Sequence, residues 1–286
     1  MLRSRLSCVV FPKRRTTGSV VCPSCGSLVG VRDDKCYSCG RSNPGLWGYG
    51  PLIRQLSAEF GFVQVVVGAS TIIYALTLLM SGSGLQIAGG GMSFLSPSSQ
   101  ALIIFGMSGA FPVFGLGWWW TLLTASWLHG NLLHILFNMM WVRDLGTAMV
   151  DFFGSSRTII IYTLSGVCGF LLSSVAGVPR TVGASAAIFG LLGAMVHYGR
   201  SGAGSSMVTS MAMRYAVILF VFGFIMPGVD NYAHAGGFLG GYLAGMWLDP
   251  LKRERMDHLI AAVVCLVLTA LAILASLVRV FGLVFF

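Results

Sequence analysis

The feature that most constrains this chain is a series of apolar runs separated by short polar turns. A helix that crosses a membrane needs about 20 predominantly apolar residues. Runs of this kind fall near residues 62–80, 119–141, 157–176, 184–199, 208–226, 231–248 and 259–281. Only 9% of the 286 residues are charged, against about 25% in soluble proteins, so they cannot form a surface that faces water. We therefore expect an all-α membrane protein with seven transmembrane helices, and we exclude a disordered chain, a coiled coil and a secreted disulfide scaffold.

The distribution of charge separates a small polar head from the apolar remainder. Residues 1–60 hold nine of the 18 lysines and arginines and three of the nine acidic residues, a net charge of +6. Residues 43–54 are rich in glycine and proline, which is typical of a linker. We expect three parts: a basic head at 1–57, a membrane core of six helices at 58–250, and a basic turn with a seventh helix at 251–286.

Four cysteines in the head form two CxxC pairs, each followed by a glycine. Ten residues separate the first pair, Cys22 and Cys25, from the second, Cys36 and Cys39. The pattern predicts a zinc knuckle over residues 22–39, because each CxxC turn directs two thiolates toward one tetrahedral ion. Four thiolates fill the coordination sphere, so this zinc is expected to be structural. Disulfides or redox dithiols are the alternative, which a reducing cytosolic environment disfavours.

Basic residues in the loops predict how the chain is oriented. Cytoplasmic loops of membrane proteins carry an excess of lysine and arginine. The loops on the side of the head hold Arg143, Arg157, Arg200, Lys252, Arg253 and Arg255, whereas the opposite loops hold only Arg180. We expect the head to be cytoplasmic and the C-terminus to lie outside, in a plasma membrane. The basic N-terminal residues also suit an organelle transit peptide, so an organelle membrane is the alternative.

Two stretches depart from a simple bundle of equal helices. Residues 81–117 carry no charge and are interrupted by glycine and proline, which predicts short helices in the outer membrane interface. The fourth predicted span is too short, because Ser185 to Gly199 reaches only about 22 Å as a helix, against a hydrocarbon core of about 30 Å. Its outer end is therefore expected to begin below the membrane surface, beside a water-filled cavity open to the outside.

Polar side chains inside a membrane are costly, so they are functional candidates. The second span contains His129, His134 and Asn138, the fourth begins at Ser185, and the sixth contains His234. A serine hydroxyl needs a base to become a nucleophile, and Ser185 with His234 would supply both groups. The Ser185 amide at a helix N-terminus, with His134 and Asn138, would bind an oxyanion.

Less specific interpretations of the same residues stay open on the sequence alone. A serine in a span rich in glycine and alanine is more often a packing residue. Three histidines would be able to hold a metal ion, although a central serine adds nothing to a zinc site. A transporter is disfavoured, because the cytoplasmic halves of spans two, four and six show no charged pathway residues.

Taken together, these residues resemble the motifs of the rhomboid family of intramembrane serine proteases. The resemblance covers roughly residues 58–250, which implies six core helices and one additional C-terminal helix. Its three motifs are H-x4-H-x3-N at His129, His134 and Asn138, GxSx at Gly183, Ser185 and Ala186, and AHxxGxxxG at Ala233, His234, Gly237 and Gly241.

The resemblance implies a catalytic dyad of Ser185 and His234 without an acidic third member. It implies an oxyanion hole formed by His134, Asn138 and the Ser185 amide, with His129 in a supporting role. It further implies that loop 81–117 is an embedded element and that the helix near 208–226 is the gate for substrate. Expected substrates are single-span transmembrane proteins, cut near the outer face through an acyl-enzyme and with no cofactor for catalysis.

One departure from the family supports an alternative function. Ala186 follows the serine where the family often has glycine. The alternative is therefore a catalytically silent rhomboid-like protein that binds transmembrane helices. For the head we expect contact with anionic lipids or a protein partner of the zinc knuckle, and no aromatic or repeated pattern favours nucleic acid.

Overall fold

A computed structural model of the chain describes residues 14–52, 61–86, 93–202, 204–252 and 254–285. Residues 1–13 of the basic N-terminus, 53–54 of the predicted linker, 87–92 of loop 81–117, and Arg253 lie outside the described residues. The chain divides into two compact units, residues 1–61 with 255–257, and residues 62–254 with 258–286.

The smaller unit is built on a short β-hairpin. Strands β1 (Ser19–Val21) and β2 (Leu28–Gly30) pair antiparallel, with Val20 opposite Val29. A 3-10 turn, η1 (Leu46–Gly48), follows. The buried side chains are Val20, Cys22, Val29, Val31 and Cys36. Such a small core seldom stabilises a fold without a metal or disulfides, and two of its five members are cysteines.

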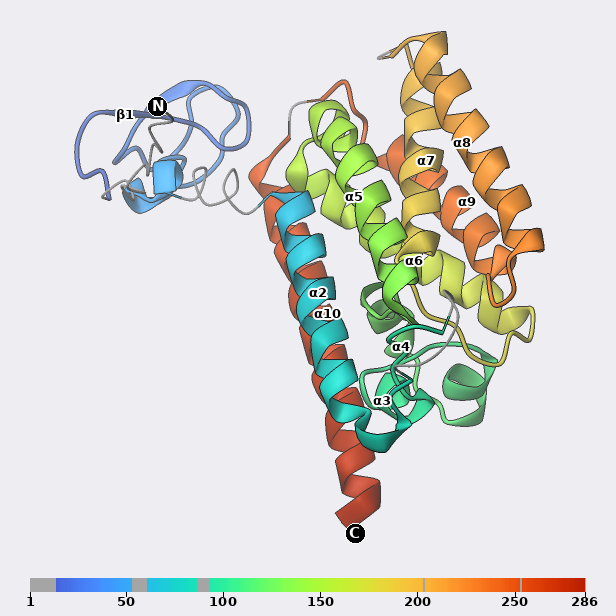
Figure 1. The fold of residues 1–286 in the computed structure, drawn as a ribbon. Coiled ribbons are helices and arrows are strands. Elements are labelled where there is room, and N and C mark those ends of the chain that lie inside the picture. The colour runs from blue at the N-terminus through green and yellow to red at the C-terminus, as the bar shows by residue number, and fades with distance from the viewer. Residues whose placement is uncertain (1–13, 53–60, 87–92, 203, 253, 286) are drawn as a thin grey trace, which may run out of the picture. The chain divides into compact units, whose positions relative to one another are not determined.

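The larger unit consists of helices. The long helices are α2 (Phe62–Met80), α5 (Leu132–Phe153), α6 (Ser155–Val175), α7 (Ser185–Arg200), α8 (Ser206–Ile225), α9 (Asn231–Trp247) and α10 (Met256–Phe285). The predicted all-α class is confirmed. Successive long helices run in alternating directions, so α5, α7 and α9 all begin at the same end of the unit (Figure 1).

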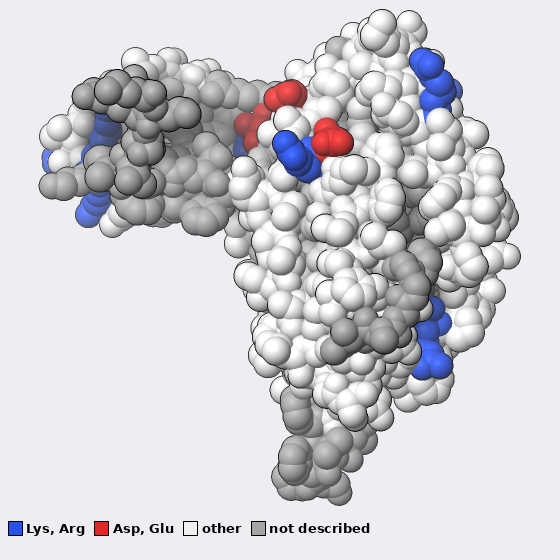
Figure 2. All heavy atoms as spheres, in the orientation of Figure 1, with Lys and Arg blue, Asp and Glu red and all other residues white. Residues whose placement is uncertain are grey.

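Four of these helices, α2, α6, α8 and α10, are long and apolar enough to cross a membrane by length and composition. The helices α7 and α9 have only 16 and 17 residues, and α5 carries Arg143, Asp144 and Asp151 in its second half. The predicted shortness of the fourth span is confirmed. On the face of the unit seen in Figure 2, the few charged side chains gather toward the two ends of these helices and leave an uncharged band between them. Such a band suits the hydrocarbon core of a membrane.

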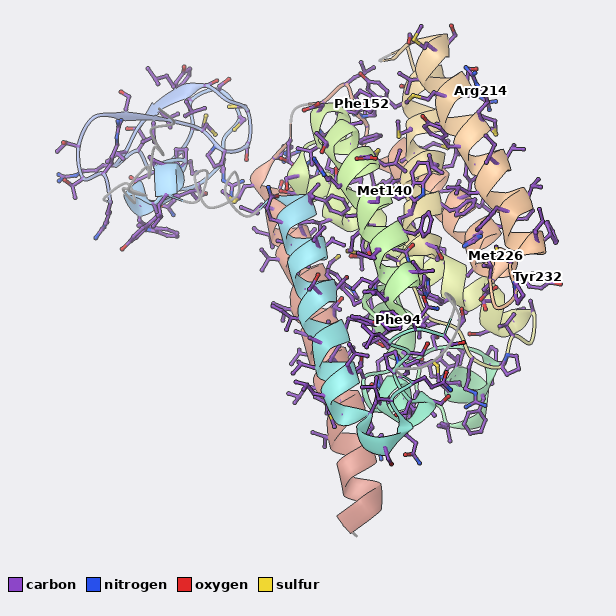
Figure 3. All side chains as sticks on the ribbon, viewed as in Figure 1. Phe94, Met140, Phe152, Arg214, Met226 and Tyr232 are labelled. Atoms are coloured by element: carbon purple, nitrogen blue, oxygen red, sulfur yellow. The ribbon has the colours of Figure 1, made fainter. Side chains whose placement is uncertain are left out.

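The predicted span at 119–141 is wrong in its position. Residues 121–127 form two short turns, α4 (Thr121–Thr124) and η4 (Ala125–Trp127), and α5 begins only at Leu132. The side chain of Asn131 caps α5 by accepting a hydrogen bond from the His134 amide at 2.7 Å. The carbonyl of Phe94, labelled beside the start of α5 in Figure 3, accepts one from Leu132 at 3.2 Å. Apolar composition alone does not distinguish these turns from a helix, whereas the cap marks where the helix begins.

Loop 81–117 contains the predicted short helices. They are η2 (Gly82–Gly84), α3 (Ser99–Ile104) and the π-turn η3 (Phe111–Gly115). The Thr124 hydroxyl donates a hydrogen bond to the Gly106 carbonyl, which ties this loop to α4. Just after the loop, Trp120 Nε1 donates to Ser276 Oγ of α10 at 2.8 Å. The seventh helix therefore contacts the segment that leads into α5, and the loop's position in the membrane interface stays a prediction.

One buried arginine joins the ends of three helices. Arg157, in the first turn of α6, is only 4% exposed. Its amide donates to the Glu254 carboxylate at 3.0 Å. Backbone carbonyls at helix C-termini carry partial negative charge, which a cation offsets. The guanidinium donates to carbonyls near the ends of α5 and α9, those of Phe153, Leu248, Asp249 and Lys252.

Helix α7 lies at the centre of the unit and packs closely on α9. Every residue from Ala186 to Val196 is buried. A Cβ atom added to Gly237 of α9 would collide with the Ala186 carbonyl, and one added to Gly241 would collide with the Gly190 carbonyl. Small residues that allow such backbone contact are what hold helices together in lipid.

The substitution Gly241→Ala is expected to destabilise the protein, because its methyl group has only the α7 backbone to occupy. We expect a loss of about 2 kcal/mol in unfolding free energy, typical of overpacking. Thermal unfolding in detergent measures the change. The matched control is Gly68→Ala on α2, where a Cβ meets nothing within 4 Å. An equal melting temperature for the two variants would contradict the packing argument.

Candidate active site

Ser185 is the first residue of α7. The loop before it reaches α7 through Gly183, whose φ of +134° lies in a region that L residues rarely adopt. The Gly183 amide donates to the Ala125 carbonyl at 2.9 Å, which anchors the loop on η4. Because the first four amides of a helix lack intrahelical partners, the Ser185 N–H is available to a ligand.

The structure brings Ser185 and His234 together. His234 Nε2 lies 3.0 Å from Ser185 Oγ, although the two residues are 49 apart in the chain. His234 is 5% exposed. Its ring stacks on Phe189, one turn after Ser185 on α7, with centroids 4.2 Å apart and an interplanar angle of 15°. The stacking restricts rotation of the imidazole, which favours the contact with the serine.

His134 and Asn138 lie on α5 beside the loop that precedes Ser185. A Cβ atom added to Gly183 would lie 2.6 Å from His134 Nε2 and 3.7 Å from Asn138 Nδ2. The expected sharing of one helix face is confirmed. Asn138 is 5% exposed, and its Nδ2 has no hydrogen-bond partner among the described residues. A buried amide nitrogen without a partner is a donor ready for a ligand.

The hydrogen bonds of the two histidines favour opposite tautomers. The Gly130 amide donates to His134 Nδ1 at 3.3 Å, so in the neutral ring the proton of His134 lies on Nε2, the atom that faces Gly183. His234 Nδ1 instead lies 3.2 Å from the Asn231 carbonyl oxygen Oδ1, which can only accept. The proton of His234 therefore lies on Nδ1, and Nε2 is left as an acceptor for the Ser185 hydroxyl.

His129 lies outside α5, which corrects its predicted place on the second span. It belongs to the turn between η4 and α5 and is fully buried. Its ring meets that of His134 edge to face, with centroids 5.3 Å apart. Neither of its ring nitrogens has a hydrogen-bond partner among the described residues. In the described part of the chain, the histidines form no group with metal-ligand spacing.

Two residues at this site, Asn231 and Phe189, are absent from the sequence-based candidates. The spacing places each of them on the same helix face as a candidate residue, because Phe189 is four residues after Ser185 and Asn231 is three before His234. Such spacing is common in any helix, so it identifies neither residue without the contacts.

The four head cysteines converge as predicted. Their sulfur atoms all lie within 4.8 Å of one another. The Sγ atoms of Cys22 and Cys39 are 3.8 Å apart, and those of Cys25 and Cys36 are 3.6 Å apart. A tetrahedral zinc ion with bonds of about 2.3 Å holds its sulfurs about 3.8 Å apart, so the cluster fits zinc and its distances are far too long for disulfides.

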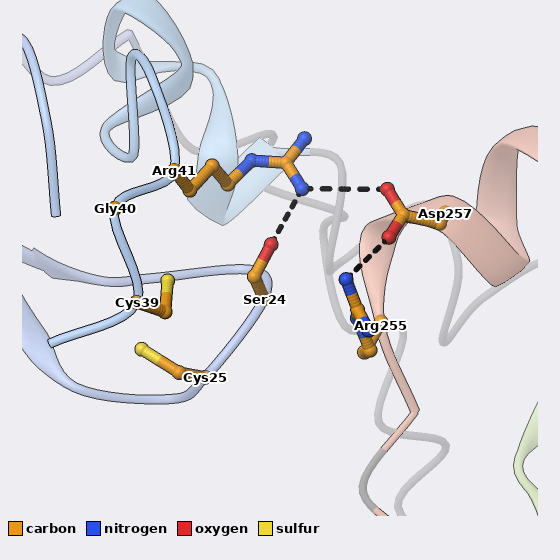
Figure 4. Close-up of a pocket in the computed structure, with 7 residues that line it drawn as sticks. All are labelled: Ser24, Cys25, Cys39, Gly40, Arg41, Arg255 and Asp257. Atoms are coloured by element: carbon orange, nitrogen blue, oxygen red, sulfur yellow. Dashed lines mark hydrogen bonds and ion pairs between the residues drawn. The ribbon is translucent and has the colours of Figure 1, made fainter.

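The turns around the cysteines repeat one geometry. Gly26 and Gly40, which follow the two CxxC pairs, both adopt positive φ. Hydrogen bonds from the side chain and the backbone of Ser27 lower the pKa of the Cys25 thiol to about 6. The backbone of Arg41 also lowers the pKa of the Cys39 thiol, but burial and the other three cysteines outweigh it and raise that pKa to about 12. Figure 4 shows the polar groups beside the cluster, where Arg41 donates to Ser24 Oγ at 2.6 Å and pairs with Asp257 at 3.6 Å.

Comparison with known proteins identifies the helical unit. Residues 116–251 match the family model described as Rhomboid domain. The chain is 32% identical over 193 residues to Rhomboid protease GluP of Bacillus subtilis (strain 168), covering 66% of this chain and 37% of that protein. It is 39% identical over 139 residues to RHOMBOID-like protein 7 of Arabidopsis thaliana, covering 45% of this chain and 42% of that protein.

The similarity also extends to a relative that is named inactive. The chain is 30% identical over 207 residues to Inactive RHOMBOID-like protein 8 of Arabidopsis thaliana, which covers 65% of this chain and 58% of that protein. The chain thus spans about two fifths of the length of the first two relatives and more than half of this one. With its long apolar helices, this chain is an integral membrane protein that carries a rhomboid domain at residues 116–251.

Proposed function

We propose that this chain is an intramembrane serine endopeptidase that cuts transmembrane segments of single-span membrane proteins near the outer face of the bilayer. The observation that carries the proposal is the 3.0 Å contact between Ser185 Oγ and His234 Nε2 at the start of α7. A hydroxyl within hydrogen-bond distance of a neutral imidazole is the arrangement of an activated serine.

In the proposed reaction, Ser185 Oγ attacks the scissile carbonyl carbon while His234 Nε2 takes the hydroxyl proton. The carbonyl oxygen becomes an oxyanion, and collapse of the tetrahedral intermediate breaks the C–N bond as His234 returns the proton to the leaving amine. This leaves an acyl-enzyme on Ser185. Water then attacks the ester, with His234 again as the base, and releases the second product. The scheme needs no cofactor.

Three donors are available for the oxyanion. They are the Ser185 amide, His134 Nε2–H and Asn138 Nδ2–H, the last two of which lie beside Gly183. A fixed donor of this kind contributes about 3 to 4 kcal/mol to transition-state stabilisation in serine proteases. Gly183 keeps the site open, because any side chain there would occupy the position beside His134 Nε2. His129, whose ring meets that of His134 edge to face, supports the position of His134.

The proposal extends to topology and partners. The head of residues 1–57, with its excess of basic residues, lies in the cytoplasm against anionic lipids or a protein that recognises the knuckle. The core of residues 58–250 lies in the plasma membrane and admits substrate past α8, and residues 251–286 add the seventh helix. The ends at which α5, α7 and α9 begin then face outward.

The test of the proposed function is labelling by a fluorophosphonate probe, which reacts with activated serines. The full-length protein in detergent is expected to be labelled, and Ser185→Ala is expected to lose labelling completely. His234→Ala removes the base and is expected to slow labelling by about 100-fold or more. The matched control is Ser174→Ala, a buried serine on α6 whose hydroxyl donates to the Phe170 carbonyl.

Cleavage of a reporter completes this test. The wild type and Ser174→Ala are expected to cut a reporter with a helix-destabilised transmembrane segment, and Ser185→Ala is expected to leave it intact. Cleavage by Ser185→Ala would overturn the proposal.

The second candidate is a catalytically silent protein that binds transmembrane helices. Two observations favour it, the alanine at position 186 and the similarity to a relative named inactive. Ala186 is fully buried, and its carbonyl meets Gly237. If Ala186 silences the site, the wild type is not labelled and Ala186→Gly gains labelling. If the first candidate holds, the wild type is labelled.

We further propose that Cys22, Cys25, Cys36 and Cys39 bind one structural zinc ion. Elemental analysis of protein purified under reducing conditions is expected to give one zinc per chain. Cys36→Ser removes a buried ligand and is expected to lose the metal, whereas Cys168→Ser on α6 is expected to keep it. Metal-free wild type with four freely alkylated head thiols would contradict this proposal.

A further inference from the structure

Only one nitrogen of the His234 ring faces Ser185, and the other meets Asn231. The Asn231 carbonyl oxygen Oδ1 lies 3.2 Å from His234 Nδ1. Asn231 is the first residue of α9, three positions before His234, so both side chains emerge from the same turn. This contact holds the Nδ1 proton in place. It thereby leaves the Nε2 lone pair directed toward the serine, as a general base requires.

The neighbouring carboxylate does not fill this role. Asp230 caps α9, with Oδ1 accepting from the Ala233 amide at 3.0 Å. Its other oxygen, Oδ2, accepts from the Ser173 hydroxyl of α6 at 2.5 Å. Both oxygens of Asp230 are therefore engaged with partners other than the His234 ring. The group within hydrogen-bond distance of Nδ1 is the Asn231 amide.

The space around the Asn231 amide is set by α8. A Cβ atom added to Gly223, a buried residue of α8, would collide with Asn231 Oδ1, and would lie 2.9 Å from Val229 Cγ1 and 3.0 Å from Asn231 Cγ. Met226 and Tyr232, labelled in Figure 3, lie on either side of the short turn that joins α8 to α9. The backbone of α8 thus lies against the carbonyl group that holds His234.

We propose that Asn231 is the positioning residue of His234 and that Gly223 of α8 provides the space in which its amide sits. The inference rests on the proposed function, because it concerns the same base. Asn231 acts through His234 and does not touch the scissile bond. A shift of α8 changes the space around Asn231, so the position of α8 and the orientation of the base are linked through one side chain.

The first test replaces the acceptor of Asn231. Asn231→Leu keeps the size of the side chain but cannot accept a hydrogen bond, and its fluorophosphonate labelling is expected to slow by about 10- to 100-fold. Asn231→Asp restores an acceptor and is expected to recover most of the rate at alkaline pH. Ser174→Ala, which removes a buried hydroxyl of α6 that donates to the Phe170 carbonyl and contacts neither Asn231 nor Asp230, is the matched control.

The pH profile distinguishes positioning from a general loss of structure. The titratable groups that act on His234 are Asp230 on its own helix and His134 on α5. A new carboxylate at position 231 favours the protonated imidazole. Since only the neutral ring is a base, the acid limb of the labelling rate of Asn231→Asp is expected to move to higher pH than in the wild type.

The second test changes the space around the Asn231 amide and removes no polar group. Gly223→Ala is expected to displace Oδ1 and to slow labelling in the same way as Asn231→Leu, whereas Gly68→Ala on α2 is expected to label like the wild type. Wild-type labelling of Asn231→Leu at every pH would overturn the inference, as would an unshifted acid limb in Asn231→Asp. If Asn231→Leu does not fold, the position of the acid limb in Asn231→Asp decides whether the inference holds. An unlabelled wild type contradicts the proposed function instead.

Discussion

The close backbone contact between α7 and α9 is the constraint on which the site depends. Apolar side chains gain little by leaving lipid for one another, so membrane helices associate through tight packing. Gly237 and Gly241 let α9 approach the carbonyls of Ala186 and Gly190. Ser185 lies one residue before Ala186, and His234 lies three before Gly237. The separation of the hydroxyl and the imidazole is thus determined less than a turn from the point where the two backbones touch.

Hydrogen bonds between uncharged groups hold the polar side chains of the site in position. The partner of Nδ1 decides whether Nε2 of each histidine donates or accepts. A backbone amide donates to His134 Nδ1, whereas a side-chain carbonyl accepts from His234 Nδ1. Among the described residues no carboxylate is hydrogen-bonded to either ring, and the two oxygens of Asp230 accept from the Ala233 amide and from Ser173. A neutral arrangement avoids the cost of burying a charge in a medium that solvates it poorly.

Periodicity and composition predict most of the fold, because hydropathy reports directly on lipid contact. The helix starts at 62, 185 and 231 and the four-cysteine cluster agree with the sequence to within a residue. The start of α5 does not, because tryptophan-rich turns are as apolar as a helix and the Asn131 cap is a local signal. The contacts of Trp120 with Ser276 and of Asn231 with Gly223 join different helices. They depend on tertiary packing and cannot be predicted from the spacing of residues in the sequence.

The buried Arg157 has a consequence for the order in which the chain assembles. Its guanidinium binds the Leu248 carbonyl, which is 91 residues later in the chain, and the Glu254 carboxylate accepts from its amide. While the chain is being synthesised, α6 therefore exists before most of the carbonyls that its arginine binds, since only that of Phe153 precedes the helix. A lone guanidinium is too costly to leave in hydrocarbon, so it stays hydrated until α9 is complete. The first turn of α6 therefore reaches its final environment only when the helix that carries His234 has arrived.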